Sequence, residues 1–477
     1  MELGVPHRFH WALIAPLLAA LTLAATALPA IADPGDLDSS FGKRGRVATA
    51  TSLGGPSWLD ADVRIARGPA GTIVAAVGNS VLRYLPDGRL DRSFGEGGKL
   101  TVTEVEGLPF SLSDVAVDQR SKIILFGEVQ IPGIRLPASY IGATIPFSQA
   151  AVVRYEGAGV LDPTFGGGDG SIVTDFDQPP YYEGPRLEGP MSVIDGKAVA
   201  GVVRGTVDAD GGLTLLGSTT EIIGCFRGTA QRVQRLIARL TPAGVFDPSF
   251  GGGDGIASET GFAGIAGFSA TGNGGEMLVG RLNASDPCKE ARPEAVGRLL
   301  PNGGPDPSFS SDGFRPLSFV GPVSAIAVDS LDRTLVVLGS TVVRLTSRGK
   351  LDRRFGRQGA AFLKLPGSSE LASVIVPHSG RVLLAGTQAV SKRKSDIGRT
   401  YLYRHSFTVI RLNSLGRSDR GFGSGGWLAT RFGKQSSAVA SDAFVDAAGR
   451  LVVGGAVARS DLEPTGGIAL ARYFLGG

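Results

Sequence analysis

Seven aspartates recur in this sequence, each followed three residues later by a phenylalanine. Carboxylates in such number could bind metal ions or transfer protons. Each repeat supplies only one of them at a constant place, which is typical of a side chain that accepts a backbone N–H and fixes a turn. We therefore predict that the aspartate holds the turn, the phenylalanine fills space between units, and the following glycine adopts a positive φ. The pairs are Asp38 with Phe41, Asp91 with Phe94, Asp162 with Phe165, Asp247 with Phe250, Asp306 with Phe309, Asp352 with Phe355, and Asp419 with Phe422.

Other residues capable of chemistry are sparse. Of the four histidines, only His378 and His405 lie beyond residue 32, and neither belongs to a zinc-binding HxH or HExxH pattern. Two GGGDG stretches, which contain Asp169 and Asp254, could form calcium loops but lack the several spaced oxygen ligands that calcium requires. No G-x-S-x-G nucleophile elbow occurs. The sequence therefore predicts no catalytic residue, no metal and no cofactor.

Composition narrows the class of protein. The chain has 477 residues with 48 Lys and Arg against 44 Asp and Glu, a formal net charge of +4. Over this length the excess is too small for a nucleic-acid binder or a membrane-surface binder. Its 71 glycines are about twice the usual share, while 42% hydrophobic residues allow a buried core. These values indicate a turn-rich globular protein, most simply an all-β one.

Residues 1–32 are predicted to be a signal peptide. Basic side chains precede an uncharged apolar run from Trp11 to Ala30, and the sequence Ala-Ile-Ala at its end matches the small-x-small cleavage pattern. An uncleaved membrane anchor is the alternative, because the run is nearly long enough to span a bilayer. No second apolar run of that length follows. We expect cleavage before Asp33, a secreted or cell-surface location, and no membrane span in the mature chain.

Three markers each recur seven times after residue 32, and together they define one repeated unit. They are the Asp-x-x-Phe turn, an apolar strand that ends in glycine, and an apolar strand with a central arginine. Each unit reads as four short strands with no long segment of helical period. We interpret the arginines as strand residues paired across the sheet or with the turn aspartates. They are Arg83, Arg154, Arg239, Arg298, Arg344, Arg411 and Arg472.

Seven four-stranded antiparallel units predict an all-β, seven-bladed β-propeller, in which radial repetition leaves only short sheet edges. A linear solenoid is the alternative, but it needs atypical polar caps that this sequence lacks. The mature chain opens on the turn at Asp38 and finishes on the strand of Arg472. The N-terminal segment therefore supplies the turn that should follow the last strand. We predict one domain, residues 33–477, whose ring is closed by its N-terminal segment.

The pattern G-x-L-D-x-x-F-G-x-x-G, present at residues 88–98 and 349–359, resembles the delta-60 tandem repeat of secreted bacterial proteins. The resemblance covers essentially the whole mature chain. The fifth unit departs from it with Ser310 in place of glycine, and the first unit has Arg44 before its last glycine. The resemblance implies a β-propeller and an exported location. The function of that family is unknown, so no catalytic residues carry over.

Two cysteines occupy matching places in consecutive units. Cys225 and Cys288 each lie eight residues after the glycine that ends the second marker. Counted from the strand that follows the Asp-x-x-Phe turn, both should fall in the connection between the third and fourth strands of their unit. Equivalent connections of neighbouring blades lie side by side. Because an exported protein meets an oxidising compartment, we predict a disulfide between them. Two free or separately placed thiols are the alternative.

Length variation is predicted on one edge of the ring, because the one–two and three–four connections of an antiparallel blade leave from the same edge. The long connections are residues 128–150, 174–204, 218–235, 281–294 and 387–406. Aromatic residues are concentrated there, and tyrosine gives a large contact area at low entropic cost. We predict that this long-loop side binds the ligand; the alternative is that these rings pin their own loops. The candidate residues are Trp58, Tyr140, Tyr181, Tyr182, Tyr401 and Tyr403.

Two functions fit these features. The first is a monomeric binding or interaction scaffold that presents its long loops to a protein, a polysaccharide or a small ligand, and not to nucleic acid. The alternative is a propeller enzyme, a lyase, hydrolase or quinone oxidoreductase, that uses the axial funnel. An enzyme should gather acids, bases and arginines at that funnel. With two histidines in the mature chain we favour the scaffold, and the residues at the mouths of the channel discriminate between the two.

Overall fold

The structure is a computed structural model of the 477-residue chain. It describes residues 32–54, 59, 61–135, 144–176, 196–225, 228–258, 261–282, 293–319, 321–365, 369–394, 401–434, 436–458 and 466–476. The chain divides into two compact units, residues 1–32 and residues 33–477. The predicted signal peptide forms the first unit, and nearly all of it lies outside the described residues. Among the described residues no helix is long and apolar enough to cross a membrane.

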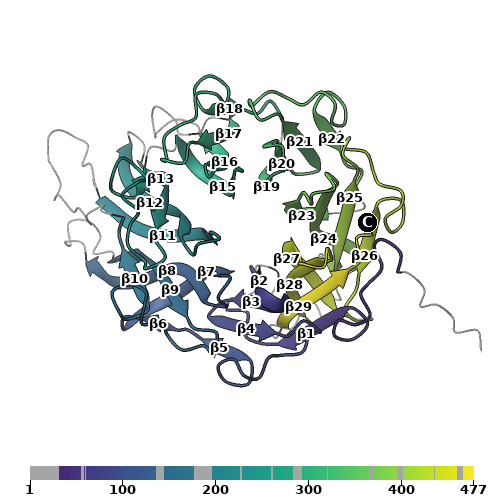
Figure 1. Ribbon diagram of the computed structural model, residues 1–477, viewed down its shortest axis with the longest axis horizontal. Helices are drawn as coiled ribbons and strands as arrows, with labels where there is room; N and C mark the ends of the chain where they lie inside the picture. The colour runs from purple at the N-terminus through teal and green to yellow at the C-terminus, as the bar shows by residue number, and fades with distance from the viewer. Residues whose placement is uncertain are drawn as a thin grey trace, which may run out of the picture. The chain divides into compact units, whose positions relative to one another are not determined.

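Residues 33–477 form seven four-stranded antiparallel blades around a central axis (Figure 1). From the innermost strand outward, blade 1 contains β2 (Arg64–Arg67), β3 (Ile73–Val77), β4 (Ser80–Tyr84) and β5 (Lys99–Thr101); blade 2 contains β7 (Leu108–Val117), β8 (Ile123–Arg135), β9 (Thr144–Tyr155) and β10 (Ser171–Thr174); blade 3 contains β11 (Gly196–Val207), β12 (Leu213–Cys225), β13 (Gly228–Leu240) and β14 (Ile256–Ala257); blade 4 contains β15 (Phe262–Ala270), β16 (Glu276–Leu282), β17 (Glu294–Leu299) and β18 (Phe314–Pro316). In the same order, blade 5 contains β19 (Val323–Val328), β20 (Thr334–Leu338), β21 (Thr341–Leu345) and β22 (Ala360–Phe362); blade 6 contains β23 (Ser369–Ile375), β24 (Val382–Lys394), β25 (Tyr401–Leu412) and β26 (Trp427–Thr430); blade 7 contains β27 (Ser437–Val445), β28 (Leu451–Ala458), β29 (Gly466–Tyr473) and β1 (Arg46–Ala50). The short β6 (Glu104–Val105) pairs with β7.

The predicted propeller and its closure are confirmed. Strand β1 pairs antiparallel with β29, in a register from Arg46 opposite Ala471 to Ala50 opposite Gly467. The last blade therefore takes its outermost strand from the N-terminal segment. The other blades are built in the same order: the strand that follows each Asp-x-x-Phe turn is the outermost strand of its blade, and the chain then enters the next blade. Each turn thus lies inside a blade, between its third and fourth strands.

The strands are apolar on both faces because each blade packs between two others. In β3, Ile73 and Ala75 belong to a buried cluster shared with blade 7, whereas Val74 and Ala76 belong to a cluster shared with blade 2. Successive side chains of a strand point to opposite faces, so one short apolar run serves two interfaces. The hydrophobic core is accordingly a series of layers between blades.

The repeated aspartates hold their turns. In all seven blades a carboxylate oxygen of the repeat aspartate accepts the backbone N–H two residues further along the chain. The repeat phenylalanines have no exposed surface. In blade 2 the ring faces a turn of the next blade: a Cβ placed on Gly244, whose φ is +85°, would lie 2.8 Å from the ring of Phe165. Glycine is needed there for both the backbone conformation and the close approach.

The strand arginines link each blade to the next. Each one donates from Nη1 to a backbone carbonyl that lies three residues beyond the arginine of the following blade. The donor and acceptor residues are Arg83 and Gly157, Arg154 and Pro242, Arg239 and Pro301, Arg298 and Ser347, Arg344 and Ser414, Arg411 and Leu475, and Arg472 and Pro86. The last pair joins blade 7 to blade 1, so the series of contacts is circular. Each guanidinium carbon also lies 4.4–5.1 Å from the centre of the repeat phenylalanine ring.

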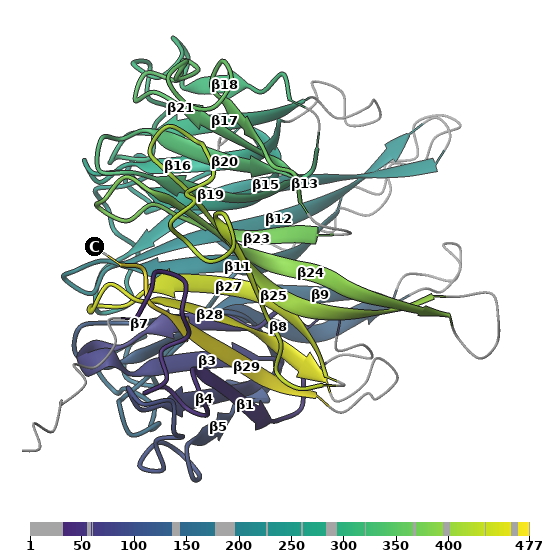
Figure 2. The ribbon, with the colours of Figure 1, turned by 90° about the vertical axis from the view of Figure 1, so that its right-hand side faces the viewer.

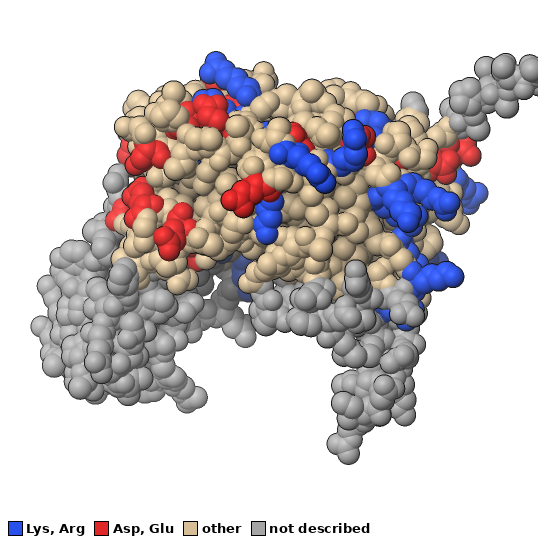
Figure 3. Space-filling model, turned by 90° about the horizontal axis from the view of Figure 1, so that it is seen from below, with Lys and Arg blue, Asp and Glu red and all other residues tan. Residues whose placement is uncertain are grey.

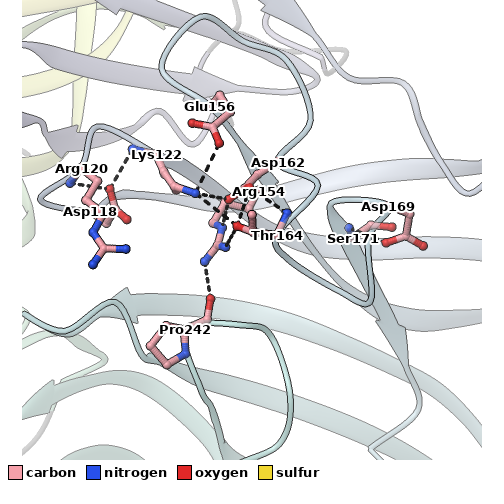
Figure 4. Close-up of polar contacts among 10 residues, drawn as sticks. All are labelled: Asp118, Arg120, Lys122, Arg154, Glu156, Asp162, Thr164, Asp169, Ser171 and Pro242. Carbon is pink, nitrogen blue, oxygen red and sulfur yellow. Dashed lines mark hydrogen bonds and ion pairs between the residues drawn. The ribbon is translucent and has the colours of Figure 1, made fainter.

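Six of the seven arginines also pair with the repeat aspartate of their own blade at 2.6–3.0 Å. Blade 2 has the most buried repeat aspartate (Figure 4). There Arg154 Nε and Lys122 Nζ each lie 2.6 Å from the same oxygen of Asp162, which has no exposed surface. Burial alone would raise the pKa of Asp162, but hydrogen bonds from Lys122, Thr164 and Arg154 outweigh it and lower this pKa.

Blade 3 has a different pairing. Within the described part of the chain Asp247 makes no ion pair, and Arg239 instead lies 3.8 Å from Glu276 of blade 4. Glu276 is buried, and burial raises its pKa to about 7 despite the nearby Arg239. Among the described residues, the ion pair of Arg239 is therefore with a carboxylate of the next blade, although its charge still helps to lower the pKa of Asp247.

Three of the predicted long loops are instead continuous β-hairpins that project from one side of the ring (Figure 2). The predictions for residues 128–150, 218–235 and 387–406 are wrong in this respect. Pairing between β8 and β9 continues to Arg135 opposite Thr144, between β12 and β13 to Cys225 opposite Gly228, and between β24 and β25 to Lys394 opposite Tyr401. Residues 196–204 of another predicted loop belong to β11. Backbone groups in these extensions are satisfied by each other, which explains why pairing extends beyond the blades.

Two predicted features lie wholly or partly outside the described residues. Cys225 ends strand β12, but Cys288 is not described, so the disulfide remains a prediction. Trp58, Tyr140, Tyr181 and Tyr182 are also outside the described residues.

The pairing of β1 with β29 leads to a first prediction. Deleting residues 33–47 removes Asp38 and part of β1, and so leaves Arg472 buried without its carboxylate. We expect the melting temperature to fall by about 10 °C or more, because an uncompensated buried charge alone costs about 3–5 kcal/mol. Differential scanning calorimetry measures this. An unchanged melting curve would contradict closure by this segment.

The difference between blades 2 and 3 leads to a second prediction. Asp162→Asn leaves Arg154 and Lys122 facing a neutral group and should cost about 3 kcal/mol of unfolding free energy, whereas Asp247→Asn should cost about 1 kcal/mol or less. Because the pKa of Asp162 is lowered in the folded state, its contribution is present above about pH 4 and is lost as the pH falls. Urea denaturation of both variants at neutral and acidic pH tests this; equal losses at neutral pH would refute it.

Candidate functional site

A cavity of about 530 Å³ lies at the ring axis on the side of the projecting hairpins. Its lining comes from blades 1, 3, 5, 6 and 7, so it belongs to the central channel and not to one seam between blades. The lining residues of β2, β19, β23 and β27 are at or near the first residues of these innermost strands, which places the cavity at one mouth of the channel. We call it the axial pocket. Its polar lining residues are Asp62, Arg64, Arg204, Ser324, Glu370, Thr387, His405 and Ser441.

The innermost strands share a distortion that helps to build this pocket. In blades 2 to 7 the pairing of the innermost strand with its neighbour skips one residue, which is a β-bulge. The skipped residues include Ser324, Ala372 and Ser441, and all three line the axial pocket. A bulge changes the direction in which a side chain points. At this channel mouth the bulge residues that line the pocket all have small side chains.

The residue after the bulge has an equivalent in every blade, and charged residues occupy this position in four consecutive blades only. Consecutive blades 7, 1, 2 and 3 carry Asp442, Arg64, Asp114 and Arg204, an alternation of acid and base that we call the charged arc. The equivalent residues of blades 4, 5 and 6 are Gly267, Ala325 and Ser373. The channel is thus charged along one arc of its wall and lined by small residues along the other.

The two acids of the charged arc bind backbone amides of the adjacent blade. Asp442 accepts the N–H groups of Ala443 and, in blade 1, of Ile65, at 2.8 and 3.1 Å. Asp114 accepts the N–H groups of Val115 and, in blade 3, of Gly205, at 2.9 and 3.1 Å. Each carboxylate therefore uses both oxygens to join neighbouring innermost strands.

Burial raises the pKa of both acids. The pKa of Asp114 rises to about 6: burial and the charge of Asp442 raise it, and the guanidinium groups of Arg204 and Arg64 lower it. The pKa of Asp442 is raised by burial, against the opposing effect of the same two arginines. Protonation of these acids near neutral pH would leave the two arginines less compensated.

One arginine of the charged arc, Arg64, retains an unused donor. Arg64 pairs with Asp62, but its Nε has no hydrogen-bond partner in the described structure. Arg204 is partly exposed and lines the pocket, and its charge acts on both Asp114 and Asp442. A guanidinium offers five N–H donors and is costly to leave unpaired. Among the described residues, Arg64 Nε is thus a buried donor beside the axial pocket that no protein acceptor satisfies.

The predicted ligand-face residues are only partly accounted for. Tyr401 and Tyr403 lie on strand β25, opposite Lys394 and Lys392, and not in a loop as predicted. They are on the same projecting hairpin whose base supplies His405 to the axial pocket. This hairpin therefore connects the predicted ligand face with the channel mouth.

The acids of the GGGDG stretches hold turns. Asp169 and Asp254 accept the backbone N–H groups of Ser171 and Ile256 at 3.0 and 2.8 Å. Within the described residues no group of three or more His, Cys, Asp or Glu could hold a metal ion.

The charged arc is absent from the predictions, because the four strands of a unit give no sign in the sequence of which is innermost. One signal could have found part of it. Ser-Asp stands just before the apolar core of the innermost strand in two units, as Ser113-Asp114 and Ser441-Asp442. These acids lie outside the Asp-x-x-Phe turn, which has its own aspartate, so their presence indicates a separate role.

The comparisons with known proteins give no closer assignment. No protein-family model and no curated protein matches the chain. Among solved structures it is similar to YCF48 bound to a D1 peptide, with a TM-score of 0.40 and 8% identity over 94% of this chain and 100% of that one. It is also similar to a chain of the mitotic checkpoint complex (TM-score 0.45, 9% identity, 99% of each chain) and to a gluconolactonase from Xanthomonas campestris (TM-score 0.31, 13% identity, 74% of this chain and 92% of that one). The peptide, partners and activity named there are those proteins' own.

The raised pKa of Asp114 leads to a third prediction. Its carboxyl group should titrate near pH 6 in a carbon-detected NMR experiment, well above the usual value of about 4. The folded protein then holds a proton that the unfolded chain has lost, so this residue makes stability fall as the pH rises from about 4 to 6. Asp114→Asn should remove that part of the pH dependence. A titration midpoint below about pH 5 would contradict the assignment.

Proposed function

We propose that this protein is an exported propeller of the delta-60 repeat family that binds its ligand at the axial pocket, on the side of the projecting hairpins. The observation that carries this proposal is a polar cavity of about 530 Å³ at the mouth of the channel, where Arg64, Arg204, Asp62 and Glu370 converge from three blades. Small-molecule sites commonly have volumes of about 300–1,000 Å³ and a few convergent polar groups. A signal peptide over residues 1–32, cleaved before Asp33, would deliver the propeller to the secreted or cell-surface compartment.

Binding is favoured over catalysis because the acids of the charged arc are already committed. Asp114 and Asp442 each accept two backbone N–H groups, which leaves little capacity for proton transfer to a substrate. An enzyme of the lyase, hydrolase or quinone-oxidoreductase kind is the second candidate. It is favoured by the gathering of acids and arginines at the axis and by the pKa of Asp114 near 6. Turnover of any ligand that binds would decide for it.

The ligand classes that fit are a small molecule, a polysaccharide or a protein segment, bound by a monomeric propeller. Nucleic acid is disfavoured by the low net charge of +4. Figure 3 supports this for the face that it views, where Asp and Glu lie mainly at one end and Lys and Arg at the centre and the other end. A nucleic-acid binder usually presents a continuous basic surface.

A variant that fills the axial pocket tests the proposal and gives the fourth prediction. Ser324→Trp places an indole at the channel wall, whereas Arg120→Trp places one on an exposed turn on the opposite side of the ring. On glycan and peptide arrays, we expect wild type and Arg120→Trp to bind the same probes and Ser324→Trp to lose them at least tenfold. Tyr401→Ala with Tyr403→Ala should weaken binding less, while leaving the melting temperature unchanged.

Three other results would contradict this proposal. If Ser324→Trp is folded, by circular dichroism, and still binds the probes of the wild type, the site lies elsewhere. If loss of binding follows Arg120→Trp instead, the turn side of the ring is the binding side. If the wild type converts a bound probe to product, the enzyme alternative replaces the scaffold.

A further inference from the structure

The seam between blades 3 and 4 contains a carboxylate at a position that belongs to the core in most blades. Glu276 is the first residue of β16, and only 2% of it is exposed. Its neighbour Leu278 belongs to the buried cluster shared by blades 3 and 4, so Glu276 faces blade 3. Among the described residues its Oε2 has no hydrogen-bond partner. The equivalent residues in blades 1, 2, 3, 5, 6 and 7 are Ile73, Ile123, Leu213, Thr334, Val382 and Leu451.

Arg239 connects blade 3 to this carboxylate. Its Nη2 lies 3.8 Å from Oε1 of Glu276 and donates to the carbonyl of Gly274 at 2.9 Å, while its Nη1 donates to the carbonyl of Pro301 at 3.0 Å. All three acceptors belong to blade 4. The Nε of Arg239 has no hydrogen-bond partner in the described chain. One donor of this guanidinium is therefore unused.

Arg239 has a second carboxylate, Asp247, within reach in its own blade. The N–H of Asp247 donates to the carbonyl of Arg239 at 2.8 Å, and the matching backbone bond occurs at 2.8 or 2.9 Å in the other six blades. In those blades the arginine Nε also lies 2.6–3.0 Å from Oδ2 of the repeat aspartate. The same backbone geometry would allow Arg239 to pair with Asp247 through the donor that it does not use.

Asp247 has an oxygen available for such a pair. Its Oδ1 accepts the backbone N–H and the hydroxyl of Ser249, at 2.9 and 2.7 Å, whereas its Oδ2 makes no hydrogen bond or ion pair with the described residues. Four other blades also supply a second base to the repeat aspartate from the turn between their first two strands, and blade 3 has Gly212 at this place. Those bases are Lys122, Arg333, Arg381 and Arg450.

The two possible partners of Arg239 differ in how readily they take up a proton. Burial raises the pKa of Glu276 to about 7, although Arg239 opposes this rise, and the charge of Asp208 adds to it. Hydrogen bonds from Ser249 lower the pKa of Asp247. At about pH 5.5, Glu276 therefore holds a proton while Asp247 is ionised.

No other described base can replace Arg239 beside Glu276. The turn 271–275 that precedes Glu276 contains no charged residue. Asp208 and Asp210 are acids, Arg298 donates to a carbonyl of blade 5, and Asp332 of blade 5 accepts an N–H group of the turn 271–275. The charge state of Glu276 thus acts mainly on Arg239.

Protonation changes which partner is favourable. While Glu276 is ionised, removing Arg239 would leave a buried carboxylate unpaired, which is costly. Once Glu276 is neutral this cost disappears, and the ionised Asp247 still offers a charge-assisted hydrogen bond.

From these contacts we propose that the seam between blades 3 and 4 is a pH-dependent switch: when Glu276 takes up a proton from solvent, Arg239 leaves Glu276 and Gly274 of blade 4 and pairs with Asp247 of its own turn. The contact of Arg239 with Pro301 is retained, because the other six arginines combine the equivalent contact with their aspartate pair. The turn 271–275 then loses its contact with Arg239. This switch does not depend on what the axial pocket binds.

Carbon-detected NMR of the guanidinium carbon of Arg239, assigned with Arg239→Lys, tests the switch in the full propeller between pH 5 and pH 8.5. We expect one transition in the wild type, with a midpoint near pH 7. Glu276→Gln should abolish it and hold the resonance at the position seen for the wild type at pH 5. Glu104→Gln, which changes an exposed glutamate of β6, is the matched control and should keep the transition. A wild-type resonance that does not shift between pH 6 and pH 8, or the same transition in Glu276→Gln, overturns the proposal.

Hydrogen–deuterium exchange shows whether the arginine moves. After correction for the intrinsic effect of pH on exchange, protection of residues 271–278 in the wild type should be at least threefold lower at pH 5.5 than at pH 8. Residues 329–336, the equivalent segment of blade 5, should not change, because Arg344 already pairs with Asp352. Unchanged protection of residues 271–278 overturns the proposal, and this wild-type test holds even if a variant fails to fold.

Asp247→Asn removes the second partner and leaves the carbonyl oxygen that holds the turn. The change in protection of residues 271–278 between pH 8 and pH 5.5 should fall to less than half of the wild-type change. A change of the wild-type size in this variant would show that Asp247 does not receive Arg239, and would refute the switch.

Discussion

A guanidinium group that reaches from one blade to the next is the contact on which the ring depends. Each strand arginine lies over the phenylalanine of its own turn and donates to a carbonyl of the following blade. The planar, permanently charged guanidinium can make these contacts at once, which a lysine ammonium cannot. The aspartate compensates the charge and fixes the turn. Three residue types per repeat thereby define the turn, the interface and the direction of the ring.

Because these contacts are at the turn side of the blades, the hairpin side is free to vary. The extended hairpins of β8 and β9, β12 and β13, and β24 and β25 leave unchanged the contact between the strand arginine of blades 2, 3 and 6 and the carbonyl of the following blade. The innermost strands vary as well, with charge in blades 7, 1, 2 and 3 and small residues elsewhere. The repeat is therefore strict where blades meet and irregular where a ligand could bind. Such a division is typical of binding surfaces carried on rigid scaffolds.

The repeats in the sequence are sufficient to predict the number of blades and the closure of the ring. The structural markers are local in sequence: Arg83 precedes Asp91 by eight residues, and the same interval separates Arg344 from Asp352. The axial pocket is different because its residues are brought together only by the ring. Arg64 and Arg204 are in different repeats, and their strands resemble the other apolar strands. The sequence places Tyr401 in a loop, because length alone does not distinguish a loop from a hairpin whose strands continue to pair.

The two chain segments that meet in blade 7 are held together by noncovalent contacts. The N–H of Gly35 lies 2.8 Å from the carbonyl oxygen of Phe474, and Arg472 donates to both Asp38 and Pro86. The contacts across this junction are of the same kind as those within the other blades, so the ring has no privileged starting point. A circular permutant, in which a short linker joins residue 476 to residue 33 and the new termini lie in another hairpin, should therefore form the same propeller. Duplicated repeats of this kind can thus be shuffled in evolution without changing the architecture.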